Sequence, residues 1–151
     1  MDAQIITIGT EILLGQIVDT NSVFIAGKLA GVGINIYHTR SVGDNEKRLK
    51  EVLGQAKREA DVIITTGGMG PTSDDITVEI AAEVWGRKLC ENSSAASHLE
   101  KHLKKIGGEM STANKKQTYF PEGSDTIPNP NGSAMGMILE EKEATIISMP
   151  G

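Results

Sequence analysis

The sequence lacks most of the features that would assign it to a specialised class of protein. Among its 151 residues only 3% are aromatic, and Cys90 is the single cysteine. One cysteine cannot form a disulfide within the chain, which is typical of a reducing compartment, so we expect a cytoplasmic protein. The first apolar run, at residues 5–8, is too short for a signal peptide, and no run approaches the roughly 20 residues of a membrane helix. Membrane association is therefore not expected.

An excess of basic charge is also missing. The chain has 15 basic and 20 acidic residues, which gives a formal net charge of −5. Because binding to nucleic acid or to an anionic membrane needs a basic face, neither partner is expected. Glycine, by contrast, is abundant, with 17 residues. The length predicts one domain over residues 1–151, and since the chain stops directly after a predicted strand, we expect this domain to be truncated at its C-terminus.

Short β-branched runs alternate with segments of helical periodicity in the first half of the chain. Strands are predicted over residues 4–8, 34–39, 61–66 and, near the end, 144–149. Three apolar stripes with helical spacing accompany the first three strands: Val23, Ala26 and Ala30; Leu49, Val52, Leu53 and Ala56; Ile76, Ile80, Ala81 and Val84. This alternation is typical of right-handed βαβ units, so the predicted fold class is α/β with a parallel sheet.

The second half of the chain is less regular. Residues 93–106 are predicted to form a helix that ends at Gly107-Gly108. Residues 110–133 are rich in Pro, Gly, Asn and Ser, which predicts a long surface excursion. Residues 137–140 and 144–149 are predicted to pair as a β-hairpin.

The segment from Asp61 to Thr77 carries the most chemical information. A buried strand runs into Gly67, Gly68 and Gly70 and then into a predicted helix. Glycines at the carboxyl end of a strand let the backbone approach a ligand, and the N-terminus of the next helix favours an anion. The pattern therefore predicts phosphate binding, with a tight turn as the alternative. It has neither the glycine order of a Rossmann fingerprint nor the Gly-Lys-Ser/Thr of a P-loop.

Carboxylates are predicted to gather near this loop. Five acidic residues follow predicted strands or begin predicted helices: Glu11, Asp19, Asp44, Asp74 and Asp75. Strand-to-helix connections of a parallel sheet lie along one edge, so these groups can converge. Because carboxylates repel a phosphate, a divalent cation is predicted between them. Helix capping is the alternative explanation for each acid taken singly.

Several longer motifs occur in a recognisable order along the chain. They are residues 8–21 (IGTEILLGQIVDTN), 42–45 (VGDN), 66–77 (TGGMGPTSDDIT), 114–117 (NKKQ), 129–136 (NPNGSAMG) and 149–151 (MPG). In this order they resemble the molybdopterin-binding (MoaB/MogA-like) domain family, and most closely the amino-terminal domain of the CinA competence/damage-inducible proteins. The resemblance covers essentially the whole chain. It implies a three-layer α/β/α fold around a mostly parallel sheet.

The resemblance also implies an activity. CinA-type domains are associated with metal-dependent hydrolysis of the pyrophosphate in ADP-ribose, giving AMP and ribose 5-phosphate, and this is the function we expect. A molybdopterin-binding or molybdopterin-adenylylating domain is the first alternative, and a non-catalytic nucleotide-binding module is the second. Asp74 stands where the molybdenum-cofactor domains commonly have Arg, which favours the CinA-like branch. The family further implies a homo-oligomer, either a dimer or a trimer.

The roles of single residues in the expected site follow from these motifs. Asp44, Asp75 and Glu11 are the predicted catalytic residues, and Asp19 is a weaker candidate for a supporting role. The predicted metal ligands are Asp44, Asp74 and Asp75, with Mg²⁺ as the default ion and Co²⁺ or Mn²⁺ as alternatives. The residues predicted to contact substrate or phosphate are Thr66, Gly67, Gly68, Met69, Gly70, Thr77, Asn114, Lys116, Gln117, Gly132 and Ser133.

Overall fold

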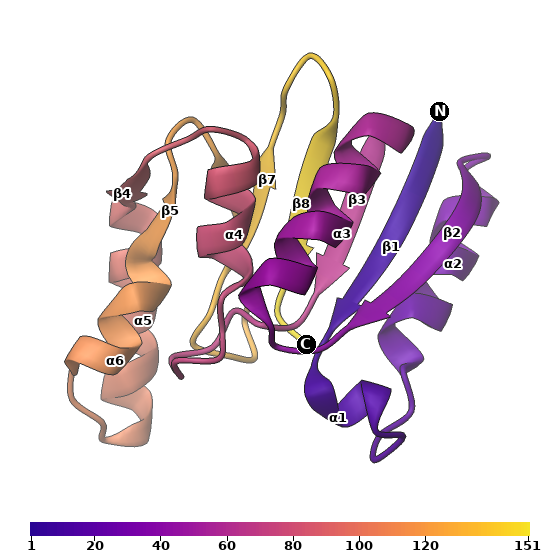
Figure 1. Ribbon diagram of the computed structural model, residues 1–151. Coiled ribbons are helices and arrows are strands. Elements are labelled where there is room, and N and C mark those ends of the chain that lie inside the picture. The colour runs from indigo at the N-terminus through magenta and orange to yellow at the C-terminus, as the bar shows by residue number, and fades with distance from the viewer.

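A six-stranded sheet organises the chain, which the computed structural model describes over residues 1–151. The strand order is β2-β1-β3-β8-β7-β6 (Figure 1). Their bounds are β1 Asp2–Ile8, β2 Asn35–Val42, β3 Val62–Thr66, β8 Thr145–Met149, β7 Gly136–Leu139 and β6 Asp125–Ile127. The first four strands in this order are parallel, and β7 and β6 run antiparallel to their neighbours. The predicted α/β class, its mostly parallel sheet and the hairpin near the end of the chain are confirmed.

Helices and a small second sheet surround the main sheet. The helices are α1 Thr10–Leu13, α2 Thr20–Gly31, α3 Glu46–Glu59, α4 Thr77–Val84, α5 Ser93–Ile106, α6 Thr112–Lys115 and the 3₁₀ turn η1 Lys116–Thr118. The second sheet pairs β4 Leu89–Glu91 with β5 Tyr119–Pro121. The predicted excursion over 110–133 therefore contains α6, η1, β5 and β6. None of the helices is both long and apolar enough to cross a bilayer.

The two faces of β1 contact different helices, which produces three layers. On one face the amide of Gln4 donates a hydrogen bond to Glu59 at the end of α3 (3.2 Å). On the other face the hydroxyl of Thr7 donates to Asp19, the N-cap of α2 (2.5 Å). Side chains three apart on a strand point to opposite faces, so α3 and α2 lie on opposite sides of the sheet (Figure 1). This arrangement is the three-layer α/β/α fold expected from the sequence motifs.

The apolar core lies between the sheet and the helices α3 and α4. Leu49, Leu53 and Ala56 of α3 are fully buried and pack with Ile6 and Ile63 of the sheet. The predicted stripe of α3 is thus confirmed as a core face.

Helix α2 differs, because it has no buried residue although its sequence is largely apolar. The predicted apolar stripe of Val23, Ala26 and Ala30 is therefore not a core face. Val23 and Ala30 are exposed, and Ala26 is half-buried.

Helix ends follow known capping chemistry. Asn45 caps α3 by accepting from the N–H of Arg48 (3.1 Å), and Asn92 caps α5 in the same way. Gly107, at φ 69°, ends α5 in the left-handed conformation, as the sequence predicts. Asp19 caps α2 by accepting from the N–H of Ser22 (2.9 Å).

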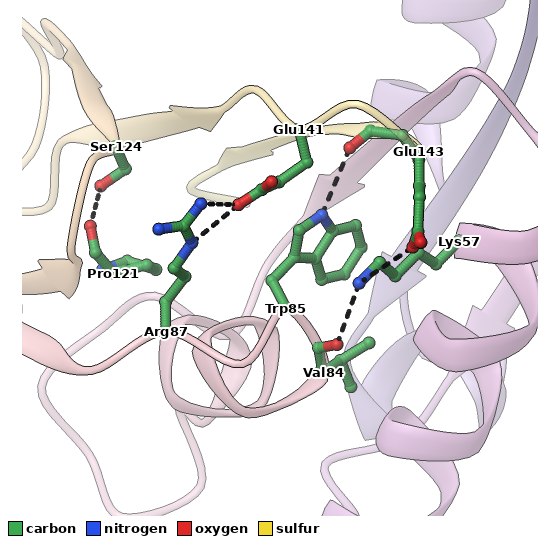
Figure 2. A network of polar contacts seen from close by, with 9 residues as sticks. Lys57, Val84, Trp85, Arg87, Pro121, Ser124, Glu141 and Glu143 are labelled. Carbon is green, nitrogen blue, oxygen red and sulfur yellow. Dashed lines mark hydrogen bonds and ion pairs between the residues drawn. The ribbon is translucent and has the colours of Figure 1, made fainter.

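A polar network fastens the turn between β7 and β8 at the amino end of β8 (Figure 2). The indole N–H of Trp85 donates to the carbonyl of Ala144 (3.3 Å), and the ammonium of Lys57 lies over the indole ring, 5.2 Å from its centre. Lys57 also pairs with Glu143 (3.6 Å). This network fixes β8 at the end of the sheet opposite to the candidate site described next.

Candidate functional site

A single large cavity of about 990 Å³ opens at the carboxyl ends of β1, β3 and β8. Ile8, Thr66 and Met149, at or near the last positions of these strands, line it. The remaining walls come from the segment after β1, the glycine loop and turn after β3, and residues 127–136, together with Asp44, Gln117, Pro150 and Gly151. In parallel α/β sheets this edge is where ligands bind, so the cavity is the candidate site.

The glycine loop cannot accept side chains at its first two positions. At Gly67, φ is +96° and an added Cβ would lie 2.1 Å from the carbonyl oxygen of Ile8. At Gly68, φ is +65° and a Cβ would lie 2.2 Å from the hydroxyl oxygen of Thr77. Left-handed φ values and such close approach leave glycine as the residue type that fits. The glycines therefore serve both the turn and its packing against β1.

Hydrogen bonds hold this loop in place and leave two donors free. The N–H of Gly67 donates to the carbonyl of Met149 (3.0 Å), and the Thr77 hydroxyl donates to the carbonyl of Gly67 (2.8 Å). The N–H groups of Gly68 and Met69 donate to no backbone acceptor of the chain. Two successive N–H groups held in a fixed loop can receive the oxygens of an anion. Thr77 is fully buried and supports the loop without lining the cavity.

Asp75 stabilises the turn at Thr72 that follows the glycine loop. Its Oδ2 accepts from the N–H of Thr72 (2.9 Å) and from the Thr72 hydroxyl (2.6 Å). Burial raises the pKa of Asp75, but the hydrogen bonds from Thr72 and from the N–H of Gly70, together with the Lys116 ammonium, outweigh it and hold the pKa below its ordinary value. Asp75 is therefore an anion at neutral pH.

The expected position of Asp74 and Asp75 at the start of a helix is wrong. Helix α4 begins two residues after Asp75, at Thr77, and its N-cap Ile76 makes no side-chain cap. The carboxylate of Asp75 bonds backward to Thr72, which closes a turn before the helix instead of capping it.

Hydrogen bonds also hold Asp44 and Asp19 in place at the cavity wall. Oδ2 of Asp44 accepts from both the N–H and the hydroxyl of Thr10 (2.9 Å each), which leaves Oδ1 outside these bonds. Asp19 accepts from Ser22 and Thr7. Burial raises the pKa of Asp19, and the hydrogen bonds from the Ser22 N–H, the Thr7 hydroxyl and neighbouring donors lower it further than burial raises it. Sequence reasoning missed Thr7 and Thr10, although threonines beside the first strand's end were a signal for such contacts.

The cavity wall carries five carboxylates and no Lys, Arg or His. The acids are Glu11, Asp19, Asp44, Asp74 and Asp75. Their predicted convergence on one edge of the sheet is thus confirmed. No three of the acidic, His or Cys side chains are close enough together to hold a metal ion by themselves. The metal site predicted from Asp44, Asp74 and Asp75 stays a prediction, and the protein alone does not preassemble three ligands for it.

Gln117 and Ser133 line the far wall of the cavity, as does the backbone at Gly132. The amide nitrogen of Gln117 donates to the carbonyl of Met69 and to the hydroxyl of Ser133 (3.2 Å each). Its oxygen Oε1 is buried and has no hydrogen-bond partner, and the same is true of the hydroxyl oxygen of Thr66 in the cavity floor. Unpaired buried polar atoms are uncommon in proteins, so water or ligand atoms are expected to serve them.

Three residues predicted to contact substrate lie outside the cavity wall: Thr77, described above, Lys116 and Asn114. The ammonium of Lys116 donates to the carbonyls of Thr72 (2.9 Å) and Asp75 (2.5 Å) and pairs with Glu79 (3.2 Å). Lys116 therefore ties the turn before α4 to η1. Asn114 forms a capping box with Ser111 at the start of α6. The role of Lys116 was not visible in the sequence because its partners Thr72 and Asp75 are more than 40 residues away. The capping box of Asn114 is local, and Ser111 three residues earlier was a signal for it.

The family of the chain follows from comparison with known proteins. The family described as "Probable molybdopterin binding domain" matches residues 4–151, which is nearly the whole chain. The chain therefore belongs to the molybdopterin-binding domain family.

Within that family the chain is similar to CinA-type proteins. The "Putative competence-damage inducible protein" of Alkaliphilus oremlandii is 48% identical over 151 residues, and that of Clostridium tetani is 47% identical. The chain spans 37% of the length of these relatives. The crystal structure of CinA from Thermoplasma acidophilum has a TM-score of 0.90 and 32% identity over 99% of this chain and 88% of that one.

Solved structures with lower identity share the fold. The molybdopterin biosynthesis enzyme MoaB of Thermus thermophilus has a TM-score of 0.62 at 23% identity, covering 99% of this chain and 80% of that one. The tungsten cofactor synthesizing protein MoaB of Pyrococcus furiosus has a TM-score of 0.61 at 22% identity, covering 99% and 81%. At these identities the two structures show a shared fold.

The expectation of ADP-ribose hydrolysis is wrong in the light of these findings. The family that matches the chain is described by molybdopterin binding, and the MoaB neighbours are described by cofactor synthesis. Both agree with the first alternative that the sequence left open. The presence of Asp74 where related domains commonly have Arg does not outweigh a match over the whole domain.

Proposed function

We propose that the cavity binds molybdopterin, a phosphorylated pterin, through its phosphate at the glycine loop. The observation that carries this proposal is the pair of free N–H groups at Gly68 and Met69, in a loop that the fold holds rigidly at the end of β3. Family membership supplies the identity of the ligand.

A cation has to accompany the phosphate because the wall has no basic side chain. Two like charges 4 Å apart repel by about 4 kcal/mol at the effective dielectric constant of a protein surface. Mg²⁺ is commonly held by one or two carboxylates together with substrate phosphates and water, so it needs no preassembled group of three ligands. Asp44, whose Oδ1 is outside the bonds to Thr10, and Asp75 fit this requirement. We therefore propose that phosphate and a divalent ion bind together.

The uncharged part of the ligand would lie on the far wall. A pterin ring carries N–H donors along one edge, and the oxygen of Gln117 is an acceptor without a partner. Gln117 is held in its orientation by Met69 and Ser133, so its acceptor points in a fixed direction. If the domain also transfers an adenylyl group, an oxygen of the pterin phosphate attacks the α-phosphorus of ATP and pyrophosphate leaves.

Anaerobic calorimetry with purified molybdopterin tests the proposal. Binding is expected in the presence of Mg²⁺ and is expected to weaken at least tenfold when EDTA replaces it. Asp44→Asn is expected to lose this dependence on Mg²⁺ because it removes one carboxylate ligand. Asp125→Asn is the matched control, since Asp125 is an exposed acid on β6 outside the cavity wall.

Absence of molybdopterin binding under both conditions would contradict the proposal. Equal affinity for molybdopterin with and without Mg²⁺ would contradict the role of the cation, but it would still support molybdopterin as the ligand. Addition of ATP distinguishes a molybdopterin-adenylylating domain from a domain that only binds molybdopterin. Release of pyrophosphate indicates adenylyl transfer, and binding without release indicates a binding domain.

A further inference from the structure

The connection between β6 and β7 contains an Asn-Gly pair at the wall of the cavity. Asn131 and Gly132 both line the cavity, and Asn131 is exposed to water. Asparagine is one of the chemically labile residue types of proteins. It is most labile before glycine, because glycine has no Cβ to obstruct an attack of its backbone nitrogen on the asparagine side chain. The proposed function gives Asn131 no role, so this reactivity is a separate property of the wall.

Both reacting groups of the pair are free of hydrogen bonds. The only hydrogen bond of Asn131 runs from its own N–H to Oδ1 of Asn129 (3.1 Å), so its side-chain amide has no partner. The N–H of Gly132 donates to no acceptor of the chain. Nothing therefore holds the side chain of Asn131 away from the backbone nitrogen of Gly132.

The other six asparagines of the chain lack this combination. In five of them the side chain is hydrogen-bonded: Asn35, Asn45, Asn92, Asn114 and Asn129. Asn129 is moreover followed by a proline, which has no N–H. After Asn21 the next N–H, that of Ser22, already donates to Asp19 (2.9 Å). The sequence and the hydrogen bonds together thus distinguish Asn131 from every other asparagine.

We propose that Asn131-Gly132 is a site of spontaneous deamidation, which adds a sixth carboxylate to the cavity wall. The backbone nitrogen of Gly132 attacks Cγ of Asn131 and forms a cyclic imide. The side-chain nitrogen leaves as ammonia, with the proton that the Gly132 nitrogen gives up. Water then opens the imide. Breaking the new bond to Cγ gives aspartate, whereas breaking the original peptide bond gives isoaspartate, whose main chain runs through the former side chain. Water is the only co-reactant.

Both products change the wall to the disadvantage of an anionic ligand. The wall already carries five carboxylates and no basic side chain, so a further negative charge repels a phosphate. Isoaspartate in addition lengthens the main chain beside Gly132, whose carbonyl oxygen lies 2.9 Å from Nε2 of His98. The next residue, Ser133, accepts the hydrogen bond from Gln117 that orients this side chain. Deamidation is therefore expected to weaken ligand binding through the charge and the shape of the far wall.

Peptide mapping tests the modification without any ligand. The folded 151-residue chain is incubated in warm, mildly alkaline buffer and then digested with trypsin, which releases residues 117–142 as one peptide. This peptide is expected to gain about 1 Da at residue 131, and an isoaspartate methyltransferase is expected to label it. Asn129 in the same peptide is the internal control. Asn131→Gln is the matched variant, because closure of its larger ring is slower, and it is expected to stay unmodified.

The mass measurement decides the proposal. Absence of the mass change at residue 131 of the folded chain overturns it, whether or not a urea-unfolded sample is modified there. Earlier modification of any other asparagine also overturns it, because the free amide and the free N–H would then not determine the site.

The expected effect on binding rests on the proposed function and is measured separately. Asn131→Asp reproduces the aspartate product, and one screened like charge is expected to weaken molybdopterin binding in the presence of Mg²⁺ about threefold to tenfold. Asn131→Gln, which adds no charge, is the control. Equal affinities of Asn131→Asp and the unchanged chain would overturn the effect of deamidation on the wall. If the unchanged chain binds no molybdopterin, the proposed function fails, and the mass measurement still decides the modification.

Discussion

Substitution of Gly67 by alanine tests the close approach of the glycine loop to β1. The new Cβ would lie 2.1 Å from the backbone carbonyl oxygen of Ile8, and φ at this position is +96°. A backbone atom of a central strand cannot rotate away as a flexible side chain can. Either the loop or the end of β1 has to move.

The expected loss of stability has two parts. A left-handed backbone costs an alanine about 1–2 kcal/mol. Forcing an additional group into a packed region costs about 1–3 kcal/mol. The sum predicts that Gly67→Ala lowers the free energy of unfolding by about 2–5 kcal/mol, which is a large part of the stability of a domain of this size.

Gly123→Ala is the matched control because it separates the two parts. Gly123 also has a positive φ, +84°, but an added Cβ would meet no atom within 4 Å. Urea unfolding is expected to show a loss of about 1–2 kcal/mol for this variant, from the backbone alone. Equal losses for the two variants would refute the argument from steric contact at Gly67.

Three further changes have defined outcomes. Thr72→Val removes the hydroxyl donor of Asp75 and should cost about 1 kcal/mol at pH 7. The pKa of Asp75 is lowered in the folded chain. Its contribution to stability is therefore present above the unfolded pKa of about 3.9 and is lost as the pH falls through the folded pKa. Urea unfolding at several pH values should show that the cost of Thr72→Val becomes smaller below about pH 4. Leu53→Ala, at a fully buried position of α3, should lower the free energy of unfolding by about 2–5 kcal/mol, and a loss below 1 kcal/mol would contradict the core assignment. Asn92→Ala should cost about 1 kcal/mol through loss of the α5 cap, measured by thermal unfolding against Asn92→Asp, which keeps the acceptor.

The central strands and long helices could be predicted because their signals are local. The strand predicted over 61–66 and the helix predicted over 93–106 agree with β3 and α5 to within a residue. Each is a periodic run between clear breakers. The pairing of β4 with β5 could not be predicted, because it joins two three-residue strands separated by α5. Cys90 lies on β4 and is exposed.

The position of the candidate site could be predicted from the sequence, but the hydrogen-bond partners of its residues could not. The glycine loop and the acids near it were predicted because parallel strands end at one edge of the sheet. The partners of those acids were not, since Thr10 contacts Asp44 across a distance of 34 residues. The role of Lys116 depends likewise on its approach to Thr72 and Asp75. A motif identifies which side chains are available, and only the fold decides which of them face the cavity.

The placement of Trp85 has a practical consequence for spectroscopy. It is the only tryptophan in the chain, and it lies buried beside Lys57 with its indole bonded to Ala144, at the end of β8 opposite the cavity. Its emission will report the loss of packing between α4 and the β7–β8 turn. It will be nearly silent when the cavity fills. Intrinsic fluorescence is therefore a clean reporter of unfolding for this chain, and ligand binding has to be followed by heat or by the ligand's own absorption.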